Sequence, residues 1–301
     1  MTAAAGRTAA PAQQADPRVV AFCLLSALSY GVAPVMAKLA YEAGAGVLTV
    51  TAGRFLMGAL AIAALLTLGR RAWRLPAQAN WGAVGLGLAT SVASLGYMGA
   101  VFYIPASLAV LIFYTFPLLV ALGARWTEGE PITPVKLAGL CAAFVGLAVA
   151  LGVSFGELDP RGVACAAAAS VGAAVHILAI GKVARWAGGA VLAVNLRSTT
   201  VGFAAMALLI GLNGGVQWPQ GETGWFGLVA TTVFFTGGIT MMYAAVARIG
   251  PVRASMLFNF EPLVAIVAAI AVLGERFGLH QVLGAALVLG AVLWVQRSRR
   301  R

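Results

Sequence analysis

Apolar runs of about 20 residues recur along nearly the whole sequence, and they limit the folds open to this chain. They lie near 19–40, 46–68, 81–103, 105–124, 134–153, 160–182, 190–212, 225–247, 251–273 and 279–296. The chain of 301 residues is 61% hydrophobic and only 10% charged, whereas an ordinary soluble domain carries about 25% charged residues. The sequence therefore predicts an all-α integral membrane protein with ten transmembrane helices and mostly short loops.

Basic residues are distributed unevenly between the two ends of these spans. One set of ends holds Arg7, Arg18, Arg70, Arg71, Arg74, Arg125, Lys136, Lys182, Arg185, Arg248, Arg253, Arg297, Arg299, Arg300 and Arg301. The opposite ends hold only Arg161 and Arg276, with Lys38 nearby. Because cytoplasmic loops collect Lys and Arg, both termini are predicted to be cytoplasmic in a bacterial-type plasma (inner) membrane. The net charge of +11 is thus explained by orientation and by anionic lipid, not by nucleic acid.

The two ends of the chain are predicted to be short tails. Residues 1–18 are rich in Ala and contain Pro11 and Pro17, which is typical of a disordered segment. Residues 297–301 form a basic tail. Cys23, Cys141 and Cys165 lie inside spans without metal-ligand spacing, so we expect packing residues, no metal and no cofactor.

One stretch of the sequence has a similar counterpart later in the chain. "FYTFPLLVALGARWTEGEPI" begins at Phe113 and "FNFEPLVAIVAAIAVLGERF" begins at Phe258, 145 positions later. At this offset Pro117 aligns with Pro262, and the pair Gly129-Glu130 aligns with Gly274-Glu275. Proline and Gly-Glu pairs are rare in such an apolar background, so the match indicates a true repeat.

The repeat divides the chain into two five-helix halves, 19–153 and 154–296. Since five is odd, the second half must enter the membrane from the opposite side. This is an inverted-topology repeat, the architecture that many secondary transporters use for alternating access.

The order Pro, then Gly-Glu, then a glycine-containing helix, in both halves of a ten-span chain, resembles the drug/metabolite transporter superfamily of EamA type. The residues that carry the resemblance are Pro117, Gly129, Glu130, Gly139 and Gly146, and then Glu261, Pro262, Gly274, Glu275 and Gly284. The resemblance implies export of amino acids, other metabolites or toxic compounds, and some related branches exchange sugar phosphates or nucleotide sugars. It gives Glu130 and Glu275 a structural role.

Glu261 is the one acidic residue embedded in an apolar run. A charged group near a helix centre costs about 2.5–3.5 kcal/mol on insertion scales, so it must be paired, hydrated or protonated. One interpretation is a proton carrier that couples transport. The other is an N-terminal cap of the half-helix that begins near Pro262.

Two arginines, Arg54 and Arg197, occupy nearly equivalent places in the two halves. A guanidinium can clamp a substrate carboxylate or phosphate with two hydrogen bonds. The alternatives are a structural partner for Glu261 or for free carbonyls, or an interfacial position reached by snorkelling. His176, in mid-span, either relays protons or contacts substrate, or packs between helices.

Prolines suggest which spans line a cavity. Pro34, Pro117 and Pro262 are each expected to break a span near its middle and to act structurally or as hinges. These spans and their neighbours bring the candidate substrate-binding residues Tyr30, Tyr97, Phe113, Tyr114 and Asn259. An aromatic lining suits amino acids or flat drugs, whereas ordinary helix packing is the alternative for any single residue.

These patterns predict a secondary transporter of small metabolites such as amino acids, acting by alternating access, and the family resemblance implies that it is an exporter. Multidrug or phosphorylated-metabolite transport is the alternative within this class. An intramembrane enzyme is disfavoured, because no catalytic constellation is present and no catalytic residue can be named. The expected partners are a small-molecule substrate, protons as a candidate coupling ion, membrane lipids, and at most a second copy, as a monomer or homodimer.

Overall fold

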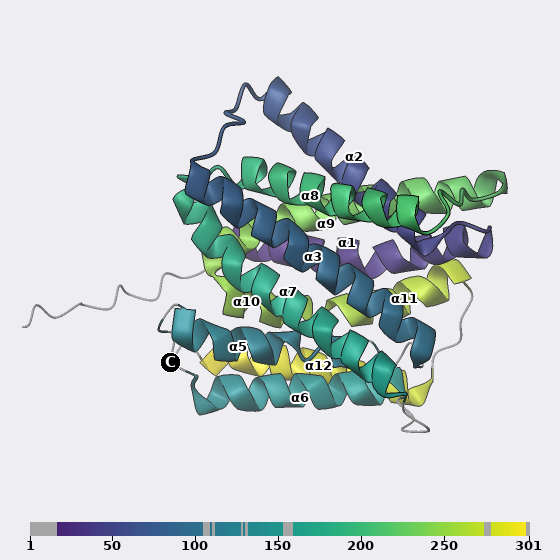
Figure 1. Cartoon of the computed structure of the whole chain (residues 1–301). Coiled ribbons are helices and arrows are strands. Elements are labelled where there is room, and N and C mark those ends of the chain that lie inside the picture. The colour runs from purple at the N-terminus through teal and green to yellow at the C-terminus, as the bar shows by residue number, and fades with distance from the viewer. Residues whose placement is uncertain are drawn as a thin grey trace, which may run out of the picture.

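The computed structural model describes residues 17–104, 109, 112–127, 129, 132–152, 159–273 and 278–298. The described residues form helices and loops, and the helices lie side by side along a common direction (Figure 1). Most of the predicted disordered tail, residues 1–18, falls outside the described residues. Its last two residues, Pro17 and Arg18, belong to α1. Residues 299–301 of the basic tail, and Glu130 and Glu275, also lie outside the described residues.

The first half of the chain supplies five helices to the described structure. They are α1 (Pro17–Glu42), α2 (Val47–Leu68), α3 (Ala77–Tyr103), α5 (Phe116–Thr127) and α6 (Pro134–Leu151). The second half supplies α7 (Pro160–Trp186), α8 (Val191–Leu212), α9 (Gly221–Ile249), the pair α10 (Pro251–Phe258) and α11 (Glu261–Leu273), and α12 (Leu279–Ser298). Within the described ranges, seven helical stretches are long and apolar enough to cross a membrane.

The helix contacts reveal that the two halves are related by a pseudo-twofold axis. If α1, α2, α3, α5 and α6 correspond to α7, α8, α9, α10–α11 and α12, then the most extensive helix contacts occur in matching pairs. The α1–α9 contact mirrors α3–α7, the α2–α9 contact mirrors α3–α8, and α1–α11 mirrors α5–α7. The pairs α2–α8 and α6–α12 map onto themselves, and they lie at opposite edges of the bundle (Figure 1). The predicted all-α fold with two inverted five-helix repeats is confirmed.

The repeated prolines mark interruptions of the fourth span in each half. Pro117 is the second residue of α5, and Pro262 is the second residue of α11. A proline suits the first turn of a helix, where its missing N–H would have no partner. The break predicted at Pro34 is absent, because α1 continues through this residue. Neighbouring helices satisfy backbone groups of α1: the Thr231 hydroxyl donates to the Ala33 carbonyl at 2.8 Å.

Glycines allow the two main helix pairs to approach closely. A Cβ added at Gly227 of α9 would lie 2.7 Å from the Met36 carbonyl oxygen of α1 and 2.8 Å from the Ala40 nitrogen. A Cβ added at Gly96 of α3 would lie 2.7 Å from the Cys165 carbonyl oxygen of α7. Small residues bring membrane helices together in this way.

Gly227→Ala is therefore expected to destabilise the protein by about 1–3 kcal/mol, because backbone atoms of α1 would have to move. Gly211→Ala is the matched control, since Gly211 also lies in a helix and a Cβ there meets no atom within 4 Å. The thermal unfolding of both variants in one detergent checks this. Equal unfolding temperatures for the two variants would contradict the close α1–α9 contact.

Candidate functional site

A cavity of about 260 Å³ lies where the two halves meet. Residues from α1, α2, α3, α5, α7, α9, α10 and α11 line it, together with the turn before α5. The polar and aromatic lining residues are Tyr30, Arg54, Thr90, Ser94, Tyr97, Phe113, Tyr114, Phe116, His176, Phe235, Phe258 and Glu261. Both repeats thus contribute to one central chamber, as alternating access requires.

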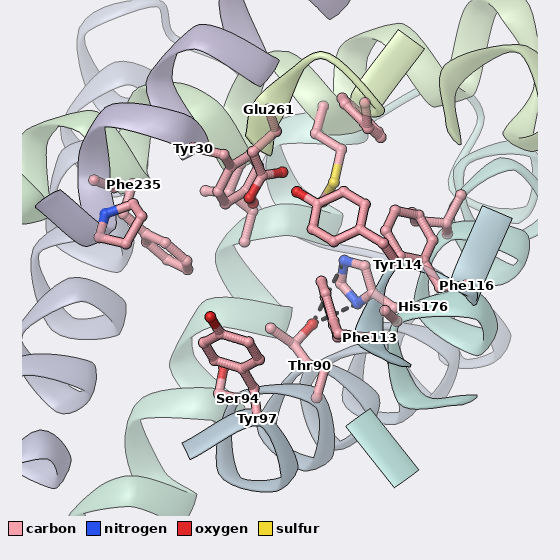
Figure 2. A pocket seen from close by; sticks show the side chains of 18 of the residues that line it. Tyr30, Thr90, Ser94, Tyr97, Phe113, Tyr114, Phe116, His176, Phe235 and Glu261 are labelled. Carbon is pink, nitrogen blue, oxygen red and sulfur yellow. Dashed lines mark hydrogen bonds between the residues drawn. The ribbon is translucent and has the colours of Figure 1, made fainter. Parts of the chain in front are cut away.

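The interrupted span of the second half places Glu261 on the wall of this cavity. Glu261 is the first residue of α11, directly after the break that follows α10. Its carboxylate points toward the hydroxyl of Tyr114 and lies beside Tyr30 (Figure 2). The carboxylate is therefore both at a helix N-terminus and in contact with the cavity, so the geometry is compatible with a cap and with a proton site.

Arg54 supplies a cation to the cavity from α2. Its Nη2 donates to the Thr51 hydroxyl at 3.2 Å, and its guanidinium lies 5.0 Å from the centre of the Phe235 ring. Its Nε is buried and has no hydrogen-bond acceptor in the part of the chain that the structure describes. The hydroxyls of Tyr41 and Tyr30 lie close enough to interact with it electrostatically. A buried guanidinium N–H without an acceptor is costly, and an anionic group on a bound molecule would satisfy it.

Aromatic rings form the wall between α3 and α5. The Tyr97 and Phe113 rings meet edge to face with centroids 5.5 Å apart, and Phe113 contacts Tyr114 at 5.4 Å and Phe116 at 5.4 Å. Tyr30 meets Phe235 on another side at 5.8 Å (Figure 2). The cavity thus combines an apolar, aromatic lining with one carboxylate and one guanidinium, a composition typical of small-molecule sites.

His176 of α7 is held by α3. Its Nδ1 lies 3.0 Å from the Leu86 carbonyl oxygen and also contacts the Thr90 hydroxyl. A carbonyl oxygen can only accept, so Nδ1 carries the proton and the ring is fixed between the two helices. Its ring also meets Tyr243 edge to face, at 5.4 Å. These contacts favour the helix-packing interpretation of His176, although its ring lines the cavity.

Two of the candidate substrate-binding residues do not line the cavity. Arg197 is exposed on α8, so the structure does not bring it to Arg54 and Glu261. Asn259 is the C-terminal cap of α10 and lies outside the lining, although Phe258 and Glu261 on either side of it contribute. Pro34 and Pro262 line the cavity, whereas Pro117 is buried in α5.

Helical spacing in the sequence connects the candidate Tyr97 with further lining residues. Thr90, Ser94 and Tyr97 follow each other at four and three positions along α3. Phe235, Ile239 and Met242 do the same along α9. These are stripes at helical spacing, and each runs along the face that its helix turns to the cavity.

The model of the EamA-like transporter family matches this sequence twice, over residues 17–152 and 160–297. The chain belongs to the EamA-like transporter family. This EamA protein is thus a multi-pass membrane transporter for a small-molecule substrate and not an enzyme, as the sequence predicted.

Comparison with solved structures supports the same fold. One chain, described only as "Crystal structure of protein", superposes with a TM-score of 0.80 at 20% identity. The match covers 94% of the EamA protein and 99% of the other chain. No curated protein matches the sequence significantly.

Proposed function

We propose that this EamA protein exports small metabolites that carry a carboxylate, with amino acids as the leading class, by alternating access. The observation that carries the proposal is Arg54, which lines the central cavity and whose buried Nε has no hydrogen-bond acceptor among the described residues. A substrate carboxylate placed there would accept the missing hydrogen bond and neutralise a buried charge. The aromatic rings around Tyr97 and Phe113 would contact an apolar side chain.

We assign Glu261 as the second charged group of the site, opposite in sign to Arg54. Its carboxylate faces Tyr30 and Tyr114 and would interact with a substrate ammonium group or exchange a proton during the cycle. Tyr30, Glu261 and Arg54 all line this cavity, so a zwitterion bound there would extend from one charge to the other. Proton coupling through Glu261 follows as part of the proposal.

We assign the orientation from the basic residues, with both termini cytoplasmic in a bacterial-type inner membrane and the halves divided at 153–154. The working unit is a monomer or a homodimer. A reporter protein fused after Arg301 that is active only in the cytoplasm should be active. If a reporter that folds only outside the cytoplasm is active when fused at the same position, the C-terminus lies outside and the assigned orientation is wrong.

Efflux from proteoliposomes tests the transport assignment. Vesicles containing the purified full chain are loaded with a panel of labelled amino acids, and efflux is followed with and without an imposed pH gradient. We expect efflux that is selective among the amino acids and faster with the gradient. Selective efflux that does not depend on the pH gradient would indicate that the protein is a facilitator without proton coupling. It would also indicate that Glu261 serves only as a helix cap. Efflux of drug-like cations or phosphorylated compounds in place of any amino acid would overturn the substrate assignment.

A further inference from the structure

A second hollow lies on the outer surface, where α5 ends beside α7. Its lining residues are Thr127, Val175, Leu178, Ala179, Lys182 and Arg185, and its volume is about 230 Å³. None of these residues lines the central cavity. The groove is therefore a separate feature that the transport cycle proposed above does not use.

The α7 residues of the groove form one stripe along the helix. Leu178 and Ala179 follow Val175 at three and four positions, Lys182 follows them at four and three, and Arg185 follows Lys182 at three, so the residues lie on one face. The stripe is apolar toward the middle of α7 and basic in its last two turns. Val175 is 51% exposed, so its side chain faces the lipid phase. The groove thus changes from apolar to cationic along the membrane normal.

One wall of the groove is formed by α5. Gly123 of α5 packs directly against the side chain of Leu178, so the two helices are in contact beside the groove. Beyond this contact α5 ends at Thr127, whereas α7 continues to Trp186. The Lys182 ammonium lies 5.1 Å from the centre of the Trp186 ring and is exposed. Tryptophan and basic side chains together mark the level of the lipid headgroups.

We propose that this groove binds one anionic phospholipid. An acyl chain would lie against Val175, Leu178 and Ala179, and the phosphate would interact with Lys182 and Arg185. Charge complementarity selects an anionic headgroup, and basic pockets between membrane helices are sites of this kind. The apolar half of the groove distinguishes a lipid from a free phosphate, which would use only the basic end.

Native mass spectrometry of the full chain in detergent tests this site, with phosphatidylglycerol and phosphatidylcholine as probes. We expect the wild-type protein to retain phosphatidylglycerol preferentially. The double variant Lys182→Gln/Arg185→Gln should lower this preference about tenfold or more, because each basic group near the surface contributes to the attraction. Arg70→Gln/Arg71→Gln is the matched control, since it removes two exposed charges outside the groove.

A third variant separates the lipid from a soluble anion. Ala179→Trp fills the apolar half of the groove and leaves both charges, so it should also reduce phosphatidylglycerol binding. If the double variant does not fold, the single variants Lys182→Gln and Arg185→Gln take its place. Equal loss of phosphatidylglycerol from the groove and control variants would overturn the proposal. Inorganic phosphate that displaces the lipid and still binds Ala179→Trp would overturn it as well, in favour of an anion site.

Discussion

Arg54→Ala is expected to slow transport of a carboxylate-bearing substrate at least about 30-fold, measured as the initial rate of efflux from proteoliposomes. Removing one partner of a buried charge pair costs about 2–5 kcal/mol, and every 1.4 kcal/mol is a factor of ten. The physical reason is that Arg54 lines the cavity and that its buried Nε has no acceptor within the described residues. Arg54→Lys should restore little of the rate, because an ammonium group lacks the planar fork of the guanidinium.

The second repeat provides a matched control for this variant. Arg197 occupies nearly the equivalent position, but its side chain is exposed and does not line the cavity. Arg197→Ala should therefore transport at close to the wild-type rate. If both variants lose activity to the same extent, the effect of Arg54 is on folding or insertion. Wild-type transport by Arg54→Ala would remove this residue from the site.

Glu261→Gln is expected to abolish the acceleration of efflux by a pH gradient while leaving exchange of substrate between the two sides measurable. Glutamine keeps the size and hydrogen-bonding capacity of the side chain near Tyr114, but it cannot bind and release a proton. The measurement is the ratio of efflux rates with and without the gradient. The ratio should fall to about one in this variant.

Glu222→Gln is the control for an effect on helix capping. Glu222 also lies in the first turn of a helix, α9, but it is exposed and outside the cavity. If Glu261 only caps α11, its variant should lose about 0.3–1 kcal/mol of stability and keep the acceleration. This outcome would refute the role of Glu261 in proton coupling. The assignment as a transporter would stand, because it does not depend on proton coupling.

Much of the fold could be predicted from the sequence, because a bilayer leaves few options. Runs of about 20 apolar residues must be helices, and the rare prolines and Gly-Glu pairs made the repeat visible against a background of Ala, Leu and Val. Pro117 and Pro262 begin half-helices, as their repeated positions suggested. Pro34 lacks a counterpart in that repeat, and α1 simply continues through it, with α9 close enough to satisfy neighbouring backbone groups.

The site was less predictable, because it depends on the direction in which each side chain points. Arg54 and Arg197 look alike in the sequence, yet one lines the cavity and the other is exposed. Asn259 falls in the turn between α10 and α11, where helical spacing no longer tells which face a residue occupies. The stripes on α3 and α9 were readable by spacing, but only the structure shows that these two faces meet.

The most direct test of the central claim compares an amino acid with its amide as substrates of the wild-type protein. The two molecules differ only in the group that Arg54 is proposed to bind, since a carboxamide carries no negative charge. We predict that proteoliposomes containing the EamA protein release the amino acid at least tenfold faster than its amide, after correction for leakage from protein-free vesicles. Equal rates for both molecules would contradict a carboxylate site at Arg54.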